Sequence, residues 1–150
     1  MVVTGGEPMI QPEIVRLTER LREFGWHITV ETAGTVDQAV ACDLMSISPK
    51  LANSTPTRRE GGKWAAQHDK LRYQPEVLKQ LMAEYPYQLK FVVSEPEDLV
   101  EIEGILKETG ADRSLVVLMP EGTSPEAIYE KSQWLVEICK REKFRYGPRL

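Results

Sequence analysis

Short apolar segments rich in β-branched residues alternate with amphipathic segments along this chain. This alternation predicts that strands are followed by helices, which is typical of an α/β fold with a parallel sheet. Gly25 ends the first amphipathic segment, and proline stands in the first turn of two later ones. The predicted strands are residues 27–31, 43–48, 89–93 and 114–119, and the predicted helices are residues 12–24, 36–41, 74–84, 96–109 and 125–140.

Both ends of the chain and a long middle segment depart from a regular α/β repeat. Only residues 1–3 precede the first glycine turn, and residues 144–150 lead into a last strand. Residues 51–73 are predicted to be irregular, and so long a connection within a compact domain is usually functional. We interpret residues 1–150 as one partial barrel domain, the C-terminal portion of a longer domain. We also expect self-association or low stability of the isolated chain, because the first strand is short and the element that it should pair with is missing.

The bulk composition argues against several classes of protein. The net charge of −4 disfavours nucleic-acid binding through phosphate neutralisation. No apolar run is long enough for a membrane span and no signal segment opens the sequence, so we expect a cytoplasmic protein. The two cysteines, Cys42 and Cys139, lie far apart and are expected to be small buried side chains rather than a disulfide or metal ligands.

Polar clusters follow the predicted strands, at the edge where α/β folds bind ligands. Gly5 and Gly6 tolerate unusual backbone angles, and Glu7 supplies a carboxylate suited to an ammonium group. Residues 31–35 begin with a carboxylate that suits ribose or substrate hydroxyls. Residues 48–50 place a hydroxyl and an ammonium on one side of an extended segment. Taken singly, each cluster also fits an ordinary tight turn or a solvated strand end.

The two histidines have different surroundings in the sequence. His27 opens a predicted strand and is interpreted as a structural residue. His68 lies in the long middle segment among basic residues, which form either a solvated face or a cover over an anionic substrate. These basic residues are Arg58, Arg59, Lys63, Lys70 and Arg72.

Taken together, the clusters resemble a known family. The chain resembles the 7-carboxy-7-deazaguanine synthases, of the radical S-adenosylmethionine (SAM) superfamily, at residues 3–8 (VTGGEP), 30–35 (VETAGT) and 46–54 (SISPKLANS). Residues 118–122 and 145–150 are similar to that family too, so the resemblance covers essentially the whole chain. The glycine turn alone indicates only a radical SAM protein, whereas residues 46–54 are far more specific.

The resemblance implies a partial radical SAM (β/α) barrel and a lyase of queuosine and deazapurine biosynthesis. In that reaction 6-carboxy-5,6,7,8-tetrahydropterin becomes 7-carboxy-7-deazaguanine with loss of ammonia, using SAM, a [4Fe–4S] cluster and Mg²⁺. A 5′-deoxyadenosyl radical from SAM removes a hydrogen atom from the pterin. The resemblance further implies a homodimer for the full-length enzyme. It assigns to SAM the residues Gly5, Gly6, Glu7, Glu31, Ser48, Lys50, Met119, Pro120 and Glu121, and to the pterin Thr4 and Gly6.

One departure from the family pattern concerns the cluster. The family's CxxxCxxC motif precedes the glycine turn and is absent from these 150 residues. Cys42 and Cys139 cannot replace it, because the cluster needs three closely spaced thiolates. Without the cluster SAM receives no electron, so we expect this chain alone to be inactive. The family's magnesium ligand also precedes the turn. The alternatives are a non-catalytic SAM-binding half-barrel or another radical SAM enzyme such as an activating enzyme, and residues 48–50 argue against the latter.

Overall fold

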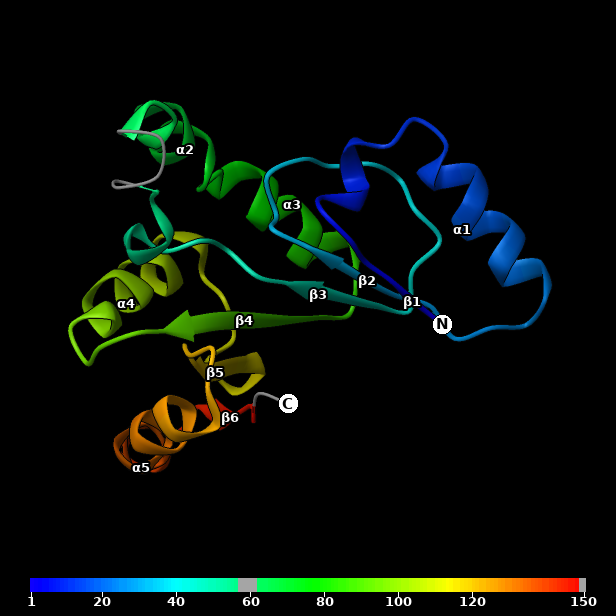
Figure 1. Cartoon of the computed structure of the whole chain (residues 1–150). Helices are drawn as coiled ribbons and strands as arrows, with labels where there is room; N and C mark the ends of the chain where they lie inside the picture. Colours follow the sequence, from blue (N-terminus) through cyan, green and yellow to red (C-terminus); the bar gives the residue numbers. More distant parts are fainter. Residues whose placement is uncertain (57–61, 149–150) are drawn as a thin grey trace.

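A single parallel sheet organises the molecule (Figure 1). The computed structural model describes residues 1–56 and 62–148. They form a six-stranded sheet in which all neighbouring strands are parallel and their spatial order follows the chain, which confirms the predicted α/β class. The strands are β1 (Val2–Val3), β2 (Thr29–Thr32), β3 (Leu44–Ile47), β4 (Tyr87–Val93), β5 (Val116–Pro120) and β6 (Arg145–Tyr146).

Local capping signals set several helix ends. Ser124 accepts a hydrogen bond from the backbone N–H of Ala127 at 3.2 Å, and proline occupies the first turn of two helices. None of the helices in the described ranges has the length and apolarity needed to cross a bilayer. The α-helices are α1 (Ile14–Glu23), α2 (Ala65–Leu71), α3 (Pro75–Glu84), α4 (Asp98–Thr109) and α5 (Pro125–Glu142), and the 3₁₀ turns are η1 (Pro8–Ile10), η2 (Ala52–Ser54) and η4 (Arg113–Leu115).

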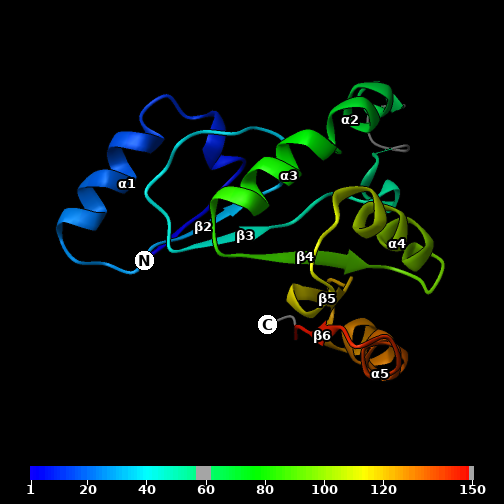
Figure 2. The same cartoon turned by 180° about the vertical axis from the view of Figure 1, so that it is seen from behind.

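The two faces of the sheet differ in polarity. On β4, Leu89 and Phe91 are buried, and helices α3, α4 and α5 contact strands β3, β4 and β5 in turn. The alternate residues Gln88 and Lys90 are only half-buried. Figures 1 and 2 show the helices along the outer side of the curved sheet. Because successive side chains of a strand point to opposite faces, the inner face carries the polar residues.

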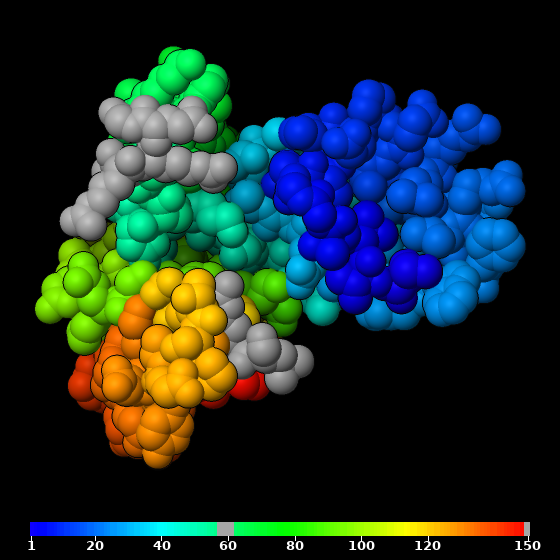
Figure 3. All heavy atoms as spheres, in the orientation of Figure 1, coloured from blue at the N-terminus to red at the C-terminus, as the bar shows by residue number. Residues whose placement is uncertain are grey.

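The described residues form an open sheet whose edges are β1 and β6. In Figure 3 the blue N-terminal part and the orange C-terminal part form two separate arms. Close to β1, Val2, Phe24 and Trp26 are exposed by 57%, 71% and 53%. The amino group of Met1 donates to the His27 carbonyl at 2.6 Å, which ties β1 to the segment that carries Trp26. Apolar side chains gathered at an unpaired sheet edge are typical of an association surface.

The predicted helix at residues 36–41 is wrong, because this segment is irregular. Several of its polar groups bind distant parts of the chain, and the Val40 N–H donates to the Gln38 carbonyl rather than in a helical pattern. The Gln38 amide donates to the Met9 carbonyl, and the Ala41 N–H donates to Thr18 Oγ1 at 3.0 Å. These tertiary hydrogen bonds override the local helix propensity.

The middle segment, residues 51–73, is more regular than predicted. It contains η2 and α2, while residues 57–61 lie outside the described ranges. Strand β2 begins two residues later than predicted, at Thr29, so His27 precedes it. His27 is exposed, with its Nδ1 3.9 Å from Asp43 Oδ2.

Candidate functional site

A glycine turn after β1 opens the site at the carboxyl ends of the strands. Gly5 has φ of 108° and Gly6 has φ of 55°, which L side chains rarely adopt. A Cβ on either residue would meet no atom within 4 Å, so the backbone conformation rather than crowding requires glycine here. Both glycines are exposed, and the turn therefore leaves main-chain groups accessible to a ligand.

The carboxylate of Glu7 binds the end of β2. Thr32 Oγ1 donates to its Oε1 and the Ala33 N–H donates to its Oε2, both at 2.7 Å. The Met9 N–H also donates to Oε1 at 3.1 Å. Since an ionised carboxylate offers about four acceptor positions, one remains for a further donor such as an ammonium group. Glu7 thus has a structural role, joining the turn to β2, that the sequence did not reveal.

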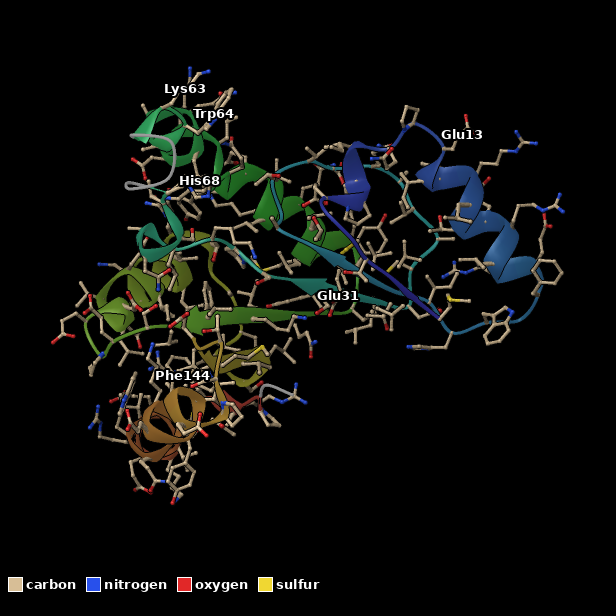
Figure 4. The ribbon with its side chains drawn as sticks, viewed as in Figure 1. Glu13, Glu31, Lys63, Trp64, His68 and Phe144 are labelled. Atoms are coloured by element: carbon tan, nitrogen blue, oxygen red, sulfur yellow. The ribbon has the colours of Figure 1, made fainter. Side chains whose placement is uncertain are left out.

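Glu31 lies at the centre of a polar network on the inner face (Figure 4). Lys90 Nζ donates to Glu31 Oε1 at 2.5 Å, and Thr4 Oγ1 donates to Glu31 Oε2 at 3.2 Å. The hydrogen bond from Lys90 holds the pKa of the Glu31 carboxyl below its usual value, although partial burial opposes this effect. The structure therefore brings together Thr4 and Glu31, two predicted site residues, and adds Lys90.

Lys50 lies beside this network, after the end of β3. Its Nζ is 3.5 Å from Ser48 Oγ, so these two predicted residues lie on the same side of the segment. Although the residue is exposed, partial desolvation lowers the pKa of its ammonium group, and the charge of Lys90 lowers it further. Glu7 and Glu31 act in the opposite direction. These charges form one electrostatic cluster at the carboxyl edge of the sheet.

A cavity of about 400 Å³ adjoins this cluster. Ser48, Lys50 and Glu121 line it, so residues predicted from two separate motifs meet at one cavity. Glu121 Oε2 accepts a hydrogen bond from Lys131 at 2.5 Å. Met119 and Pro120 belong to β5 and are not among the lining residues. The other lining residues are Pro49, Leu51, Asn53, Ser54, Val92 and Ser94.

A second cavity, of about 450 Å³, lies between α2 and the ends of β2 and β3. Lys50, His68 and Arg72 provide its ionisable lining. His68 Nδ1 is buried, with no hydrogen-bond partner in the part of the chain that the structure describes. Figure 4 shows His68 on α2. The remaining lining residues are Ala33, Thr35, Trp64, Gln67 and Leu71.

The basic cluster predicted around His68 is only partly assembled at this cavity. Lys63 and Lys70 are exposed and are not lining residues, and Lys63 Nζ lies 5.0 Å from the centroid of the Trp64 ring. Arg58 and Arg59 lie outside the described residues. Of the described basic residues in this cluster, Arg72 reaches the cavity.

Lys90 is the main site residue that sequence reasoning missed. It stands between Leu89 and Phe91, and a lysine inside a buried parallel strand is unusual, which is a signal that could have drawn attention to it. Glu31 was predicted as a site residue, but its pairing with Lys90 could not have been identified in this way, because the two residues lie on β2 and β4 with β3 between them.

The cysteines do not fit an iron–sulfur cluster. Both are buried, as predicted, and burial raises the pKa of the Cys42 and Cys139 thiols. A cluster ligand must be a thiolate, which a raised pKa disfavours. Within residues 1–56 and 62–148, no group of three or more His, Cys, Asp or Glu side chains could hold a metal ion.

The fold of this chain is similar to that of solved structures. Solved structures of the radical SAM enzyme SuiB from Streptococcus suis match 99% of this chain at 12% identity. The TM-score is 0.61 for SuiB over 39% of its chain, and 0.63 for SuiB bound to S-adenosylmethionine over 37%. At this low identity the likeness concerns the fold alone. The chain thus has a partial radical SAM fold, as predicted.

More particularly, the resemblance to the 7-carboxy-7-deazaguanine synthases is confirmed along the whole chain. The synthase of Halobacterium salinarum is 42% identical over 160 aligned positions, that of Rhodopirellula baltica 38% over 151, and that of Pyrobaculum aerophilum 32% over 158. The alignments cover 100% of this chain but 62%, 59% and 62% of these relatives. The chain therefore spans about three fifths of their length. No protein-family model matches it.

Proposed function

We propose that this chain is the SAM- and substrate-binding portion of a 7-carboxy-7-deazaguanine synthase. The proposed reaction converts 6-carboxy-5,6,7,8-tetrahydropterin to 7-carboxy-7-deazaguanine with loss of ammonia, in an enzyme that is a homodimer when full length. The observation that carries the proposal is the 42% identity to a protein of that name along the entire chain. The cavity lined by Ser48, Lys50 and Glu121 supports it, because motifs far apart in sequence meet there.

The chemistry of the residues fits SAM, which carries an ammonium group, a carboxylate and ribose hydroxyls. In this proposal Glu7 and the glycine turn accept the ammonium group, and Ser48 and Lys50 bind the carboxylate or the ribose. Glu31 accepts hydrogen bonds from the ribose or from the pterin, and the hydrogen bond from Lys90, which lowers its pKa, favours the ionised form that accepts them. We assign Thr4 and Gly6 to the pterin, and Met119, Pro120 and Glu121 to the region of the adenine.

SAM supplies the radical chemistry when it is bound and reduced, and this chain's residues bind and orient the reactants. Because Cys42 and Cys139 do not fit a cluster, we assign the ligands of the [4Fe–4S] cluster to protein outside these 150 residues. The family resemblance places the Mg²⁺ ligand there as well. We therefore expect the chain by itself to bind SAM without cleaving it.

Isothermal titration of the chain with SAM tests this proposal. We expect saturable binding that Lys50→Met weakens about tenfold, the loss expected for a charge-assisted hydrogen bond. Lys79→Met is the matched control, because Lys79 pairs with Glu76 on the exposed side of α3. Absence of SAM binding by the folded chain would contradict the proposal. After anaerobic reconstitution with iron and sulfide, formation of 5′-deoxyadenosine would contradict the assignment of the cluster ligands.

The same titration with 6-carboxytetrahydropterin separates the proposal from its alternatives. The chain saturated with SAM is expected to bind the pterin, and Thr4→Val is expected to weaken that binding, since Thr4 donates to Glu31 at the inner face. A non-catalytic SAM-binding half-barrel, or a different radical SAM enzyme, would bind SAM and not the pterin.

A further inference from the structure

The segment that carries Ser48 and Lys50 is held from outside the sheet. The Ser48 N–H still donates to the Thr32 carbonyl of β2 at 2.7 Å. Beyond it, the chain leaves β3 through Pro49 and enters the short turn η2. From Lys50 onward, the side chains of Glu101 on α4 and of Arg72, which follows α2, bind the backbone of this segment.

Two acidic residues of α4, one turn apart, hold the far part of the segment. Asp98 is buried, and its Oδ2 accepts hydrogen bonds from Asn53 Nδ2 at 2.8 Å and from the Ser94 N–H at 2.7 Å. Glu101 Oε2 accepts a hydrogen bond from the Ala52 N–H at 2.9 Å. Residues three apart lie on the same side of a helix, so α4 presents both carboxylates to residues 52–53.

Arg72, which follows α2, holds the near part of the segment. Its Nη1 donates to the Lys50 carbonyl at 2.9 Å and to Glu101 Oε1 at 2.6 Å. Its Nε donates to Asp69 Oδ1 at 2.7 Å, and only 14% of the side chain is exposed. A guanidinium presents several donors in a rigid plane, whereas a lysine ammonium cannot serve these three acceptors at this spacing.

We infer that Arg72 and Glu101 are positioning residues for the ligand site. They bind one another, and they fix the main chain on both sides of Leu51, at the Lys50 carbonyl and at the Ala52 N–H. Lys50 lines both cavities, and the direction in which its side chain enters them then depends on this pair. That the ligand is SAM rests on the proposed function, whereas the ordering of residues 50–54 rests on the contacts alone.

Two measurements on Arg72→Gln and Glu101→Gln test the inference. Both variants should weaken SAM binding about tenfold in isothermal titration, because charge-assisted hydrogen bonds that orient Lys50 are lost. Both should also lose amide hydrogen-exchange protection within residues 50–54. Arg113→Gln is the matched control. Arg113, in η4, donates to both carboxylate oxygens of Glu103 on α4, at 2.8 and 2.6 Å, so the substitution breaks an ion pair to the helix that carries Glu101. It should change neither readout.

The outcomes separate this inference from the proposed function. If the unmodified chain binds no SAM, the proposed function fails and hydrogen exchange alone decides: faster exchange confined to residues 50–54 supports the positioning role, and unchanged exchange overturns it. If the chain binds SAM and Arg72→Gln binds it as tightly as Arg113→Gln does, the inference is wrong. Should Arg72→Gln not fold, Arg72→Lys replaces it, with the same expected changes because lysine keeps the charge but loses the geometry.

Discussion

Replacing Lys90 with methionine tests the ion pair at the centre of the inner face. The Lys90 and Glu31 side chains are 19% and 38% exposed, and the two charged atoms lie 2.5 Å apart. Exposed ion pairs contribute about 0.2–1 kcal/mol, whereas removing one partner of a buried pair costs about 3–5 kcal/mol. Because water screens Glu31, we expect Lys90→Met to lower the free energy of unfolding by about 1 kcal/mol at pH 7.

This loss should depend on pH in a defined direction. The hydrogen bond from Lys90 lowers the pKa of Glu31 in the folded state. Its stabilisation is therefore present above the unfolded pKa of about 4.3 and is lost as pH falls through the lower folded value. Urea unfolding of the chain and the variant should give a difference that shrinks below about pH 4.5, and carboxyl NMR should show a higher Glu31 pKa in the variant.

Lys79→Met is the control for this comparison, because its pair with Glu76 is exposed and should leave the free energy of unfolding unchanged. The stabilisation should be fully present at about pH 7 and partly lost at about pH 3.5. If the chain and Lys90→Met differ in free energy of unfolding by the same amount at both pH values, the reasoning is refuted. An unchanged Glu31 pKa in the variant would refute it too.

Two further predictions concern packing and association. Gly34 has φ of 73°, and a Cβ there would lie 2.7 Å from Ile47 Cγ2 and would also clash with Leu78. Gly34→Ala should therefore lower the free energy of unfolding, measured by urea titration, by about 2–4 kcal/mol. Gly25 has a similar φ of 74° but open space around it, so Gly25→Ala should lower the free energy of unfolding by only about 1–2 kcal/mol. Equal losses of stability in the two variants would contradict the steric argument. Phe24→Glu should reduce self-association in sedimentation velocity without changing the circular dichroism spectrum, because Phe24 is 71% exposed. An unchanged sedimentation profile would show that this surface does not mediate association.

The elements set by local signals were predictable from the sequence. Helix α5 begins where Ser124 and Pro125 indicate it, and β4 follows from its run of β-branched and aromatic residues. The structure of residues 36–41 was not predictable from the sequence, because it depends on hydrogen bonds to Met9 and Thr18. Helix α2 was missed in a segment whose turn-forming residues suggested irregular structure throughout.

The position of the candidate site was also predictable, but its internal contacts were not. Parallel strands bring their carboxyl ends to one edge, so the motifs at Gly5, Glu31 and Ser48 had to lie near one another. The pairing of Lys90 with Glu31 requires the strand order and register, which single motifs do not provide. The contact of Arg72 with Glu101 joins the ends of two helices and has no local sequence signal.

The most direct test of the central claim is to locate SAM on the chain by ¹H–¹⁵N NMR. Titration with SAM should shift the amide signals of residues 4–7, 31–33, 48–54 and 119–122, which meet at the carboxyl edge of the sheet. Signals of α1, on the outer side, should remain unchanged and serve as the internal control. Saturable shifts confined to other surfaces, or no shifts at SAM concentrations that saturate binding, would contradict the claim that this edge forms the SAM site.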